Sequence, residues 1–228
     1  MREIVLDTET TGLDPLRGDR LVEIGCVEIF NRMPTGQTFH RHINPQRAMS
    51  EEAFAVHGLS AEFLADKALF AHVVEEFLEF LGDAPLVIHN ASFDIKFINA
   101  ELDRVGRAPI PLARAIDTIE IAKRKIPGAR YSLDELCKRF GVDVSARTKH
   151  GALLDAQLTA EIYLELIGGR QRGLMLAPVE IAAAQAVESV RAARQRPEKL
   201  QPLITVLELE AHAAFITKEL GDKSLWNA

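Results

Sequence analysis

Two acidic residues follow a short apolar run near the start of the chain. In "VLDTETTGLD" (5–14), Asp7 and Glu9 come after Val5 and Leu6, with only Thr8 between them. Side chains alternate along a strand, so Asp7 and Glu9 point to the same face. Burying two neighbouring carboxylates is costly. One of them could cap the turn that follows, but that role does not account for a same-sided pair.

Two further acids and a histidine occur in helical contexts. Asp94 shares a helical face with Ile98 and Leu102, where its alternative role is a buried hydrogen bond to Asn90 or to nearby backbone. Asp155 in "KHGALLDA" (149–156) flanks another apolar face. His150 lies five residues before Asp155, which is ~140° around a helix. We therefore expect His150 in the loop before the helix, next to Gly151, although a lone histidine is more often solvated or part of a core.

Four acids and one histidine suggest metal-assisted hydrolysis. Oxygen ligands favour hard cations such as Mg²⁺ or Mn²⁺ over zinc. Two such ions ~3.5–4 Å apart can clamp the attacking and leaving oxygens of a phosphoryl displacement. An imidazole with an ordinary pKa of ~6.5 can accept a proton from the attacking water near neutral pH.

Composition is compatible with that chemistry. The 228 residues carry a net charge of −6, whereas a protein that grips nucleic acid through Lys and Arg alone is usually basic. Bound cations would supply the missing positive charge. The chain has no apolar run of the ~20 residues that span a membrane, and its start lacks a signal-peptide pattern. Cys26 and Cys137 lie in apolar stretches, and we expect free buried thiols in a cytoplasmic protein.

The pattern of apolar residues predicts an α/β fold with a mixed five-stranded sheet flanked by helices on both faces. On the second strand, Leu21 should face the same way as Glu23 and Val27. The first three predicted strands form an antiparallel meander; all five cover 3–7, 20–30, 37–43, 84–90 and 114–119. We predict helices from Ser50 and over 69–81, 92–106 (capped by Ser92), 132–141 and 152–169.

The composition changes after Gly169. Residues 170–200 contain six Lys or Arg and three Asp or Glu, with mostly small apolar residues, so we predict a flexible linker with nascent helix. Helical apolar spacing returns over 203–220, and Trp226 follows. An amphipathic helix after a linker has nothing of its own to pack on. The segment 201–228 is therefore a predicted docking tail.

The motifs "DTET", "HNASFD" and "HGALLDA" together resemble those of the DEDDh 3′→5′ exonucleases, over roughly residues 1–169. The resemblance implies a ribonuclease-H-like exonuclease domain. It also implies that Asp7, Glu9, Asp94 and Asp155 bind two divalent cations, Mg²⁺ or Mn²⁺, and that His150 is the general base. Asp7, Glu9 and Asp155 would touch the substrate as well.

The segment "EEAFAVHGLS" (51–60) is similar to the family's segment whose Glu and His contact the terminal nucleotide. This similarity implies that Glu52 and His57 bind substrate. A helix-start acid and a turn histidine are the alternative roles for these two residues.

Within the family, the chain resembles the proofreading subunits of bacterial DNA polymerase III. "QRGLML" (171–176) resembles a motif that binds the sliding clamp, beta, through Gln171, Leu174 and Leu176; a helix-exit loop is the alternative. The tail resembles the segment that tethers such subunits to the polymerase alpha subunit, which raises the effective concentration of the nuclease at the primer end. Nothing in the sequence demands the theta subunit. The implied substrate is a single-stranded or frayed 3′ DNA end, cut to deoxynucleoside monophosphates.

Two other functions compete with proofreading as interpretations of these motifs. A free-standing DEDDh ribonuclease that trims RNA 3′ ends would have nearly the same active-site motifs, but it would not need residues 170–228. A catalytically inactive scaffold is disfavoured because all four acids and the histidine are present.

Overall fold

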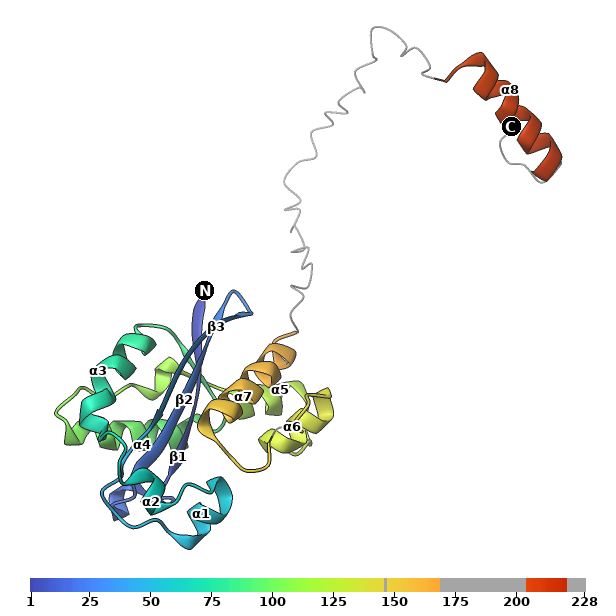
Figure 1. Cartoon of the computed structure of the whole chain (residues 1–228). Coiled ribbons are helices and arrows are strands. Elements are labelled where there is room, and N and C mark those ends of the chain that lie inside the picture. Colours follow the sequence, from blue (N-terminus) through green and yellow to red (C-terminus); the bar gives the residue numbers. More distant parts are fainter. Residues whose placement is uncertain (146, 169–203, 221–228) are drawn as a thin grey trace, which may run out of the picture. The chain divides into compact units, whose positions relative to one another are not determined.

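The computed structural model describes residues 1–145, 147–168 and 204–220 (Figure 1). The described residues belong to two units, one up to residue 168 and one formed by 204–220, and each is treated by itself. In the first unit the strands are β1 (Arg2–Thr10), β2 (Leu21–Phe30), β3 (Met33–His42), β4 (Leu86–Ile88) and β5 (Ala115–Asp117). Its α-helices are α1 (Glu51–His57), α2 (Ala61–Leu64), α3 (Phe70–Leu81), α4 (Ala91–Arg104), α5 (Thr118–Lys125), α6 (Leu133–Phe140) and α7 (Ala152–Leu166); 3₁₀ turns cover Pro15–Arg17 and Leu112–Arg114.

The sheet is mixed and has five strands, as predicted, and their order is β3-β2-β1-β4-β5. β1, β2 and β3 form the expected antiparallel meander, and β4 and β5 run parallel to β1. In the register of β1 and β2, Asp7 lies opposite Gly25, and Glu9 lies opposite Glu23. The two acids of β1 therefore sit at the end of a long strand, where β2 still pairs with their backbone and the pairing with β4 has ended at Leu6.

A bulge next to Glu9 corrects one expectation. The pairing shifts so that Thr10 lies opposite Leu21. An extra residue in one strand reverses the side-chain alternation beyond it. Leu21 therefore packs in the same apolar cluster as Ile24, and the prediction that it faces the same way as Val27 was wrong.

Helices cover both faces of the sheet. Ile4 and Leu6 of β1 belong to one apolar cluster with side chains of α3 and α4. Val5, between them, belongs to a second cluster with Tyr163 and Leu164 of α7. The far side of α7 packs on α5 and α6, so α7 is covered on two sides (Figure 1). α4 and α7 thus approach β1 from opposite faces, each bringing its first turn to the end of the sheet that carries Asp7 and Glu9.

Gly25 permits the close contact between β2 and the start of α7. A Cβ atom placed on Gly25 would lie 2.2 Å from the backbone carbon of Ala152 and 2.2 Å from the nitrogen of Leu153. Any side chain there would push the first turn of α7 away from the sheet. That turn carries Asp155.

We expect Gly25→Ala to destabilise the protein by roughly 2–4 kcal/mol, because the new methyl overlaps backbone rather than a movable side chain. Urea unfolding would measure the change in free energy. Gly36→Ala is a matched control: nothing lies within 4 Å of its added Cβ, so its cost is about 1–2 kcal/mol of left-handed backbone strain. Equal losses in the two variants would contradict the close-approach argument.

The start of α4 is not capped as predicted. Ser92 lies inside the helix, and Asn90 occupies the N-cap position with a left-handed backbone (φ 69°) and no side-chain cap bond. Asp117, at the end of β5, accepts hydrogen bonds from the amides of Asn90 (3.3 Å) and Ala91 (3.1 Å). The same carboxylate caps α5 through the amide of Ile119 (2.8 Å). The fifth strand therefore ends at 117 rather than 119. The single carboxylate of Asp117 holds the N-termini of both α4 and α5.

Other boundaries also differ from prediction. β3 begins at Met33 rather than 37, because Asn31 and Arg32 form a two-residue hairpin turn with positive φ at both positions. β1 continues to Thr10 instead of ending at 7, and α7 ends at Leu166 instead of 169. Cys26 and Cys137 are buried free thiols, as expected.

The second unit contains α8 (Val206–Phe215) followed by a π-helical turn (Ile216–Leu220). Thr205 and Glu208 form a capping box that fixes the helix start. The structure thus confirms a helix within 203–220, and it leaves Val206 and Leu207 more than 70% exposed. The predicted linker (170–200) and the predicted clamp motif (171–176) lie outside the described residues. Among the described residues, no helix is long and apolar enough to cross a membrane.

Candidate active site

Three elements bring the predicted site residues together at one end of the sheet. β1 supplies Asp7 and Glu9, the first turn of α4 supplies Asp94, and the first turn of α7 supplies Asp155. His150 lies in the loop just before α7, as expected. Ligand atoms of Glu9, His150 and Asp155 all lie within 4.8 Å of one another. Asp7 feels the charges of the other three acids, so all four carboxyls share one electrostatic site.

Local contacts fix the orientation of the carboxyls. Asp94 is buried and accepts a hydrogen bond from the hydroxyl of Thr8 at 2.7 Å. Of the alternative role, a buried hydrogen bond to Asn90 or to nearby backbone, the structure shows the backbone part, because backbone amides of Thr8 and Asp94 also bond to this carboxyl. Asp155 is 2% exposed, and its amide donates to the carbonyl of Gly151 (2.9 Å) in the first helical turn. Because helix N-termini carry partial positive charge, both first turns favour ionised acids.

Without a bound cation, it is unfavourable for all four carboxyls of the site to be ionised at once. Burial, followed by repulsion from Asp94, Glu9 and Asp155, raises the pKa of Asp7 well above its usual range. Burial, followed by repulsion from Asp155, Glu23 and Asp94, raises the pKa of Glu9 to about 8. Burial raises the pKa of Asp94 to about 7, against the hydrogen bond from Thr8. The folded chain therefore concentrates negative charge that only cations or protons can balance.

Arg147 supplies part of that balance. Its guanidinium makes a bidentate ion pair with Asp155, with Nε–Oδ1 2.6 Å and Nη2–Oδ2 2.7 Å, and it also bonds to Asp134. The side chain is only 7% exposed. The Arg147 guanidinium on Asp155 shows that the site around this acid stabilises positive charge. Oxygen-rich, mutually repelling carboxylates with raised pKa values fit divalent metal ions of the hard, oxygen-preferring class.

We expect the metal-free protein to lose stability as pH rises from about 4.5 to about 8. In this window the unfolded chain releases the Glu9 proton near its usual pKa of 4.5, whereas the folded chain holds it to about 8. The folded state then binds more protons, so the free energy of unfolding falls with pH. Glu9→Gln removes the share of this slope that Glu9 contributes, on the order of a few kcal/mol, and leaves the shares of Asp7 and Asp94.

Urea unfolding in chelator at several pH values, for wild type and Glu9→Gln, measures the difference. Added Mg²⁺ or Mn²⁺ should restore wild-type stability most strongly above about pH 8, where protons no longer compete for Glu9. Parallel pH profiles for the two proteins in chelator would contradict the raised pKa of Glu9.

A backbone hydrogen bond holds His150 in position, while its side chain remains accessible to solvent. Its amide donates to the carbonyl of Val56 in α1 (3.3 Å), which joins the α7 loop to the opposite wall of the cleft. The imidazole is 47% exposed. Its Nδ1 lies 2.9 Å from Nη2 of Arg147 and 3.2 Å from Oδ2 of Asp155. Nδ1 can accept a hydrogen bond from Arg147 or, in its protonated tautomer, donate one to Asp155, but it cannot do both at once.

A cleft of about 620 Å³ opens beside Glu9 and contains the two predicted substrate residues. Glu52 and His57 both line it, together with Leu13 and Phe93. His57 is buried; its Nδ1 accepts from the amide of Leu59 (3.0 Å) and its Nε2 lies 3.3 Å from the carbonyl of Thr10. Burial lowers the pKa of His57, so the ring is neutral. Both ring nitrogens are therefore already used within the protein.

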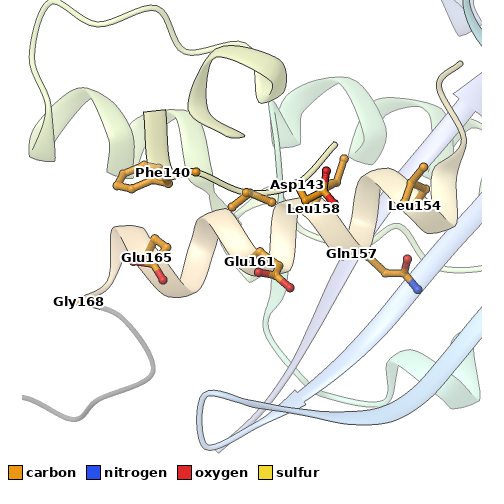
Figure 2. A pocket seen from close by; sticks show the side chains of 10 residues that line it. Phe140, Asp143, Leu154, Gln157, Leu158, Glu161, Glu165 and Gly168 are labelled. Carbon is orange, nitrogen blue, oxygen red and sulfur yellow. The ribbon is translucent and has the colours of Figure 1, made fainter. Parts of the chain in front are cut away.

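A second cavity, of about 760 Å³, lies between the end of α6 and the outer face of α7 (Figure 2). Phe140 and Leu158 contribute apolar surface, and Asp143, Glu161 and Glu165 add acids along its sides. None of the four converging carboxyls or His150 lines it. This cavity has no part in the site described above.

Comparison with known proteins agrees with this geometry. The sequence profile of the exonuclease family RNase_T matches residues 4–163. DNA polymerase III subunit epsilon of Rickettsia conorii is 48% identical over 228 aligned residues, covering 96% of this chain and 97% of the relative. The Escherichia coli K12 subunit of the same name is 41% identical over 238 aligned residues, covering 100% and 98%.

The chain belongs to the exonuclease family, among its DNA polymerase III epsilon members.

Solved structures of exonucleases share the fold of this epsilon-family chain. Exonuclease X in complex with 5′ overhanging duplex DNA superposes with a TM-score of 0.56 at 26% identity, covering 72% of this chain and 90% of its own. The nuclease domain of 3′hExo, a DEDDh family member bound to rAMP, superposes with a TM-score of 0.64 at 19% identity, covering 75% and 94%. The predicted ribonuclease-H-like exonuclease fold is confirmed. Divalent metal ions are the cofactors that this family implies.

Sequence reasoning missed several residues that support the site. Thr8 bonds to Asp94, and Asp117 holds the start of α4. Glu23 accepts a hydrogen bond from the amide of Ala152 (3.2 Å) at the start of α7. Arg147 had one detectable feature, a cation in the loop that leads to "KHGALLDA". The others depend on contacts between distant segments, for which a single sequence offers no pattern.

Proposed function

We propose that this chain is the 3′→5′ proofreading exonuclease subunit of a bacterial DNA polymerase III, and that it hydrolyses 3′-terminal nucleotides of DNA to deoxynucleoside monophosphates. The observation that carries the proposal is the convergence of four carboxyls and one histidine beside a cleft, in a chain whose epsilon relatives match along nearly its full length. The match includes the tail, which the nuclease chemistry itself does not need.

In this proposal Asp7, Glu9, Asp94 and Asp155 hold two divalent cations, Mg²⁺ or Mn²⁺. When bound, such ions polarise the scissile phosphate and stabilise the charge that develops on its oxygens. The chain's own contribution is to hold the four carboxyls in fixed positions on β1, α4 and α7. Thr8 orients Asp94, and the partial positive charge at the N-termini of α4 and α7 favours the ionised acids. Arg147 must exchange part of its contact with Asp155 when that acid takes up a metal ion.

His150 is the proposed general base. Its ring is half exposed, lies beside Asp155, and is carried by a loop rather than by the helix. A neutral imidazole can accept the proton of the attacking water and pass it to solvent through its exposed edge. Arg147 Nη2 lies 2.9 Å from Nδ1 and holds the ring beside the carboxyls.

The cleft lined by Glu52 and His57 is the proposed seat of the terminal nucleotide. Its volume of about 620 Å³ falls in the range of sites that hold small ligands. Glu52 brings a carboxylate that can accept a hydrogen bond from the 3′ end. Because both nitrogens of His57 are engaged, we assign it to shaping the wall through Thr10 and Leu59 rather than to a direct hydrogen bond with the nucleotide.

The proposed assembly follows the epsilon relatives. Residues 201–228 would bind the polymerase alpha subunit, and Gln171, Leu174 and Leu176 would bind the sliding clamp, beta. Within the described part of the tail, the exposed apolar residues Val206, Leu207 and Phe215 suit such a contact. The theta subunit is compatible but not required. A cytoplasmic location at the replisome goes with this function.

The second candidate is a free-standing ribonuclease that trims RNA 3′ ends. One observation favours this candidate: the 3′hExo nuclease domain, whose fold this chain shares, is bound to rAMP, a ribonucleotide. The active-site carboxyls would serve either substrate. The tail is what separates the two functions, because a self-contained trimmer has no use for a polymerase tether.

We expect a protein cut after Gly169 to keep its nuclease activity and to lose binding to the polymerase alpha subunit. Pull-down of purified alpha by full-length and shortened protein measures this, with hydrolysis of a labelled DNA oligonucleotide as the control for folding. A shortened protein that still retains alpha would refute the tether. If the full-length protein does not bind alpha and degrades RNA far faster than DNA, the result would favour the RNA-trimming function.

A further inference from the structure

A cluster of two histidines and one glutamate lies at the edge of the sheet, outside the proposed catalytic set. Glu23 comes from β2, and His40 and His42 come from β3, with His42 directly opposite Glu23 in the strand register. Nε2 of His40 lies 2.6 Å from Oε1 of Glu23, and Nε2 of His42 lies 3.5 Å from the same atom. One ligand atom of each residue falls within a group no wider than 4.8 Å.

We propose that Glu23, His40 and His42 form a separate metal site that takes a borderline transition-metal ion such as Zn²⁺. Two imidazole nitrogens and one carboxylate oxygen are a donor set that suits zinc, with the fourth position open to water. The proposed catalytic carboxyls offer mostly oxygen and suit Mg²⁺ or Mn²⁺. The two sites therefore differ in the class of ion they select.

The cluster is built as a ligand site rather than as a surface pair. Glu23 is buried, and its second oxygen accepts a hydrogen bond from the amide of Ala152 (3.2 Å), so its first oxygen is held toward the histidines. Because His40 and His42 are two residues apart on one strand, their rings share a face, with centroids 4.9 Å apart. Support of this kind for a ligand is what metal sites require.

The surroundings leave the cluster open to solvent. The side chains of His40 and His42 are about one-third and one-quarter exposed (34% and 26%), so solvent reaches the cluster from one side. Phe63 of α2 packs edge-on against His42, with centroids 5.0 Å apart, which limits rotation of that ring. The nearby cation Lys67 lies over the Phe63 ring and pairs with Asp66 (2.7 Å).

The position of the site suggests its consequence. Glu23 lies opposite Glu9 across β1 and β2, and through Ala152 it holds the start of α7. An ion bound to Glu23, His40 and His42 would cross-link β2 and β3, and through Glu23 it would also fix the first turn of α7. We therefore expect occupancy to stabilise the fold without any contact with substrate.

Metal titration of the full-length protein tests the proposal. Zn²⁺ and Co²⁺ are added to wild type, to His42→Gln and to the double variant His40→Gln/His42→Gln, all in excess Mg²⁺. Glutamine keeps a hydrogen-bond donor toward Glu23, so the variants should fold. His72→Gln, on the exposed side of α3, is the matched control. Bound equivalents come from calorimetry, and the coordination geometry comes from the visible spectrum of bound Co²⁺.

We expect wild type and His72→Gln to bind one more equivalent of Zn²⁺ than the double variant, with a tetrahedral Co²⁺ spectrum. His42→Gln should bind at least about 100-fold more weakly, since even loss of a supporting group costs 10–100-fold. The melting temperature should rise with Zn²⁺ only where the site is intact. Equal Zn²⁺ equivalents in wild type and the double variant, or a loss also in His72→Gln, would overturn the proposal.

Discussion

Asp7→Ala is expected to abolish nucleotide release, by about 10³-fold or more, because it removes a carboxyl that faces all three other acids and with it several kcal/mol of charge stabilisation. The loss should persist at every pH and metal concentration tested. Single-turnover hydrolysis of a 3′-labelled oligonucleotide measures it. Asp103→Ala, which removes an exposed acid from α4, should leave the rate unchanged.

The same variant should be more stable than wild type when no metal is present. Repulsion among Asp7, Asp94 and Glu9 is part of what raises the pKa of Asp7, so removing one member relieves the others. Thermal melting in chelator near pH 8 measures the gain, and added Mn²⁺ should then stabilise the variant less than wild type. An Asp7→Ala protein that is active at the wild-type rate, or that melts far below wild type in chelator, would contradict the assignment of Asp7 to a metal site.

His150→Ala is expected to lower the rate of hydrolysis by about 10²–10⁴-fold, the usual contribution of a positioned general base. The half-exposed ring contacts Arg147 and Asp155, but the bidentate ion pair between those two residues does not need it, so the fold should be unaffected. The wild-type rate should rise with pH as the imidazole loses its proton, and this rise should vanish in the variant. His72→Ala serves as a control for loss of an exposed histidine.

These pH profiles must be recorded at saturating metal ion. Glu9 and Asp94, with pKa values of about 8 and about 7, also release protons in this range, and metal loading alone would make the rate depend on pH. At saturating metal ion, metal loading no longer changes with pH, so the remaining pH dependence of the rate reports the general base. A flat wild-type profile from about pH 5.5 to about pH 8.5 under these conditions would rule out His150 as the base.

The placement of each site residue on its own element could be predicted from local geometry, whereas their convergence on one site was implied by the resemblance of the motifs. Strand alternation places Asp7 and Glu9 on one face, and β1 shows that they share the end of a paired strand. Helical spacing put Asp94 on a buried face and His150 off the helix, and both expectations agree with α4 and α7. These inferences depend only on the periodicity of a strand or a helix, which a single segment contains.

The supporting contacts could not be predicted in the same way. Asp117 caps two helices because β5 ends beside the start of α4, and Glu23 holds Ala152, 129 residues further along the chain. Leu21 faces the other cluster because one bulge interrupts the register next to Glu9. Such features arise from the pairing of distant segments, so they appear only when the sheet is assembled.

The most direct test of the central claim is excision from a primer with a mispaired 3′ end by the purified full-length protein, with Mg²⁺ or Mn²⁺ and with chelator. We expect stepwise release of deoxynucleoside 5′-monophosphates from the 3′ end, only with metal, and none from Asp7→Ala. Release that persists in chelator, release from the 5′ end, or an inert wild-type protein in the presence of metal would contradict it.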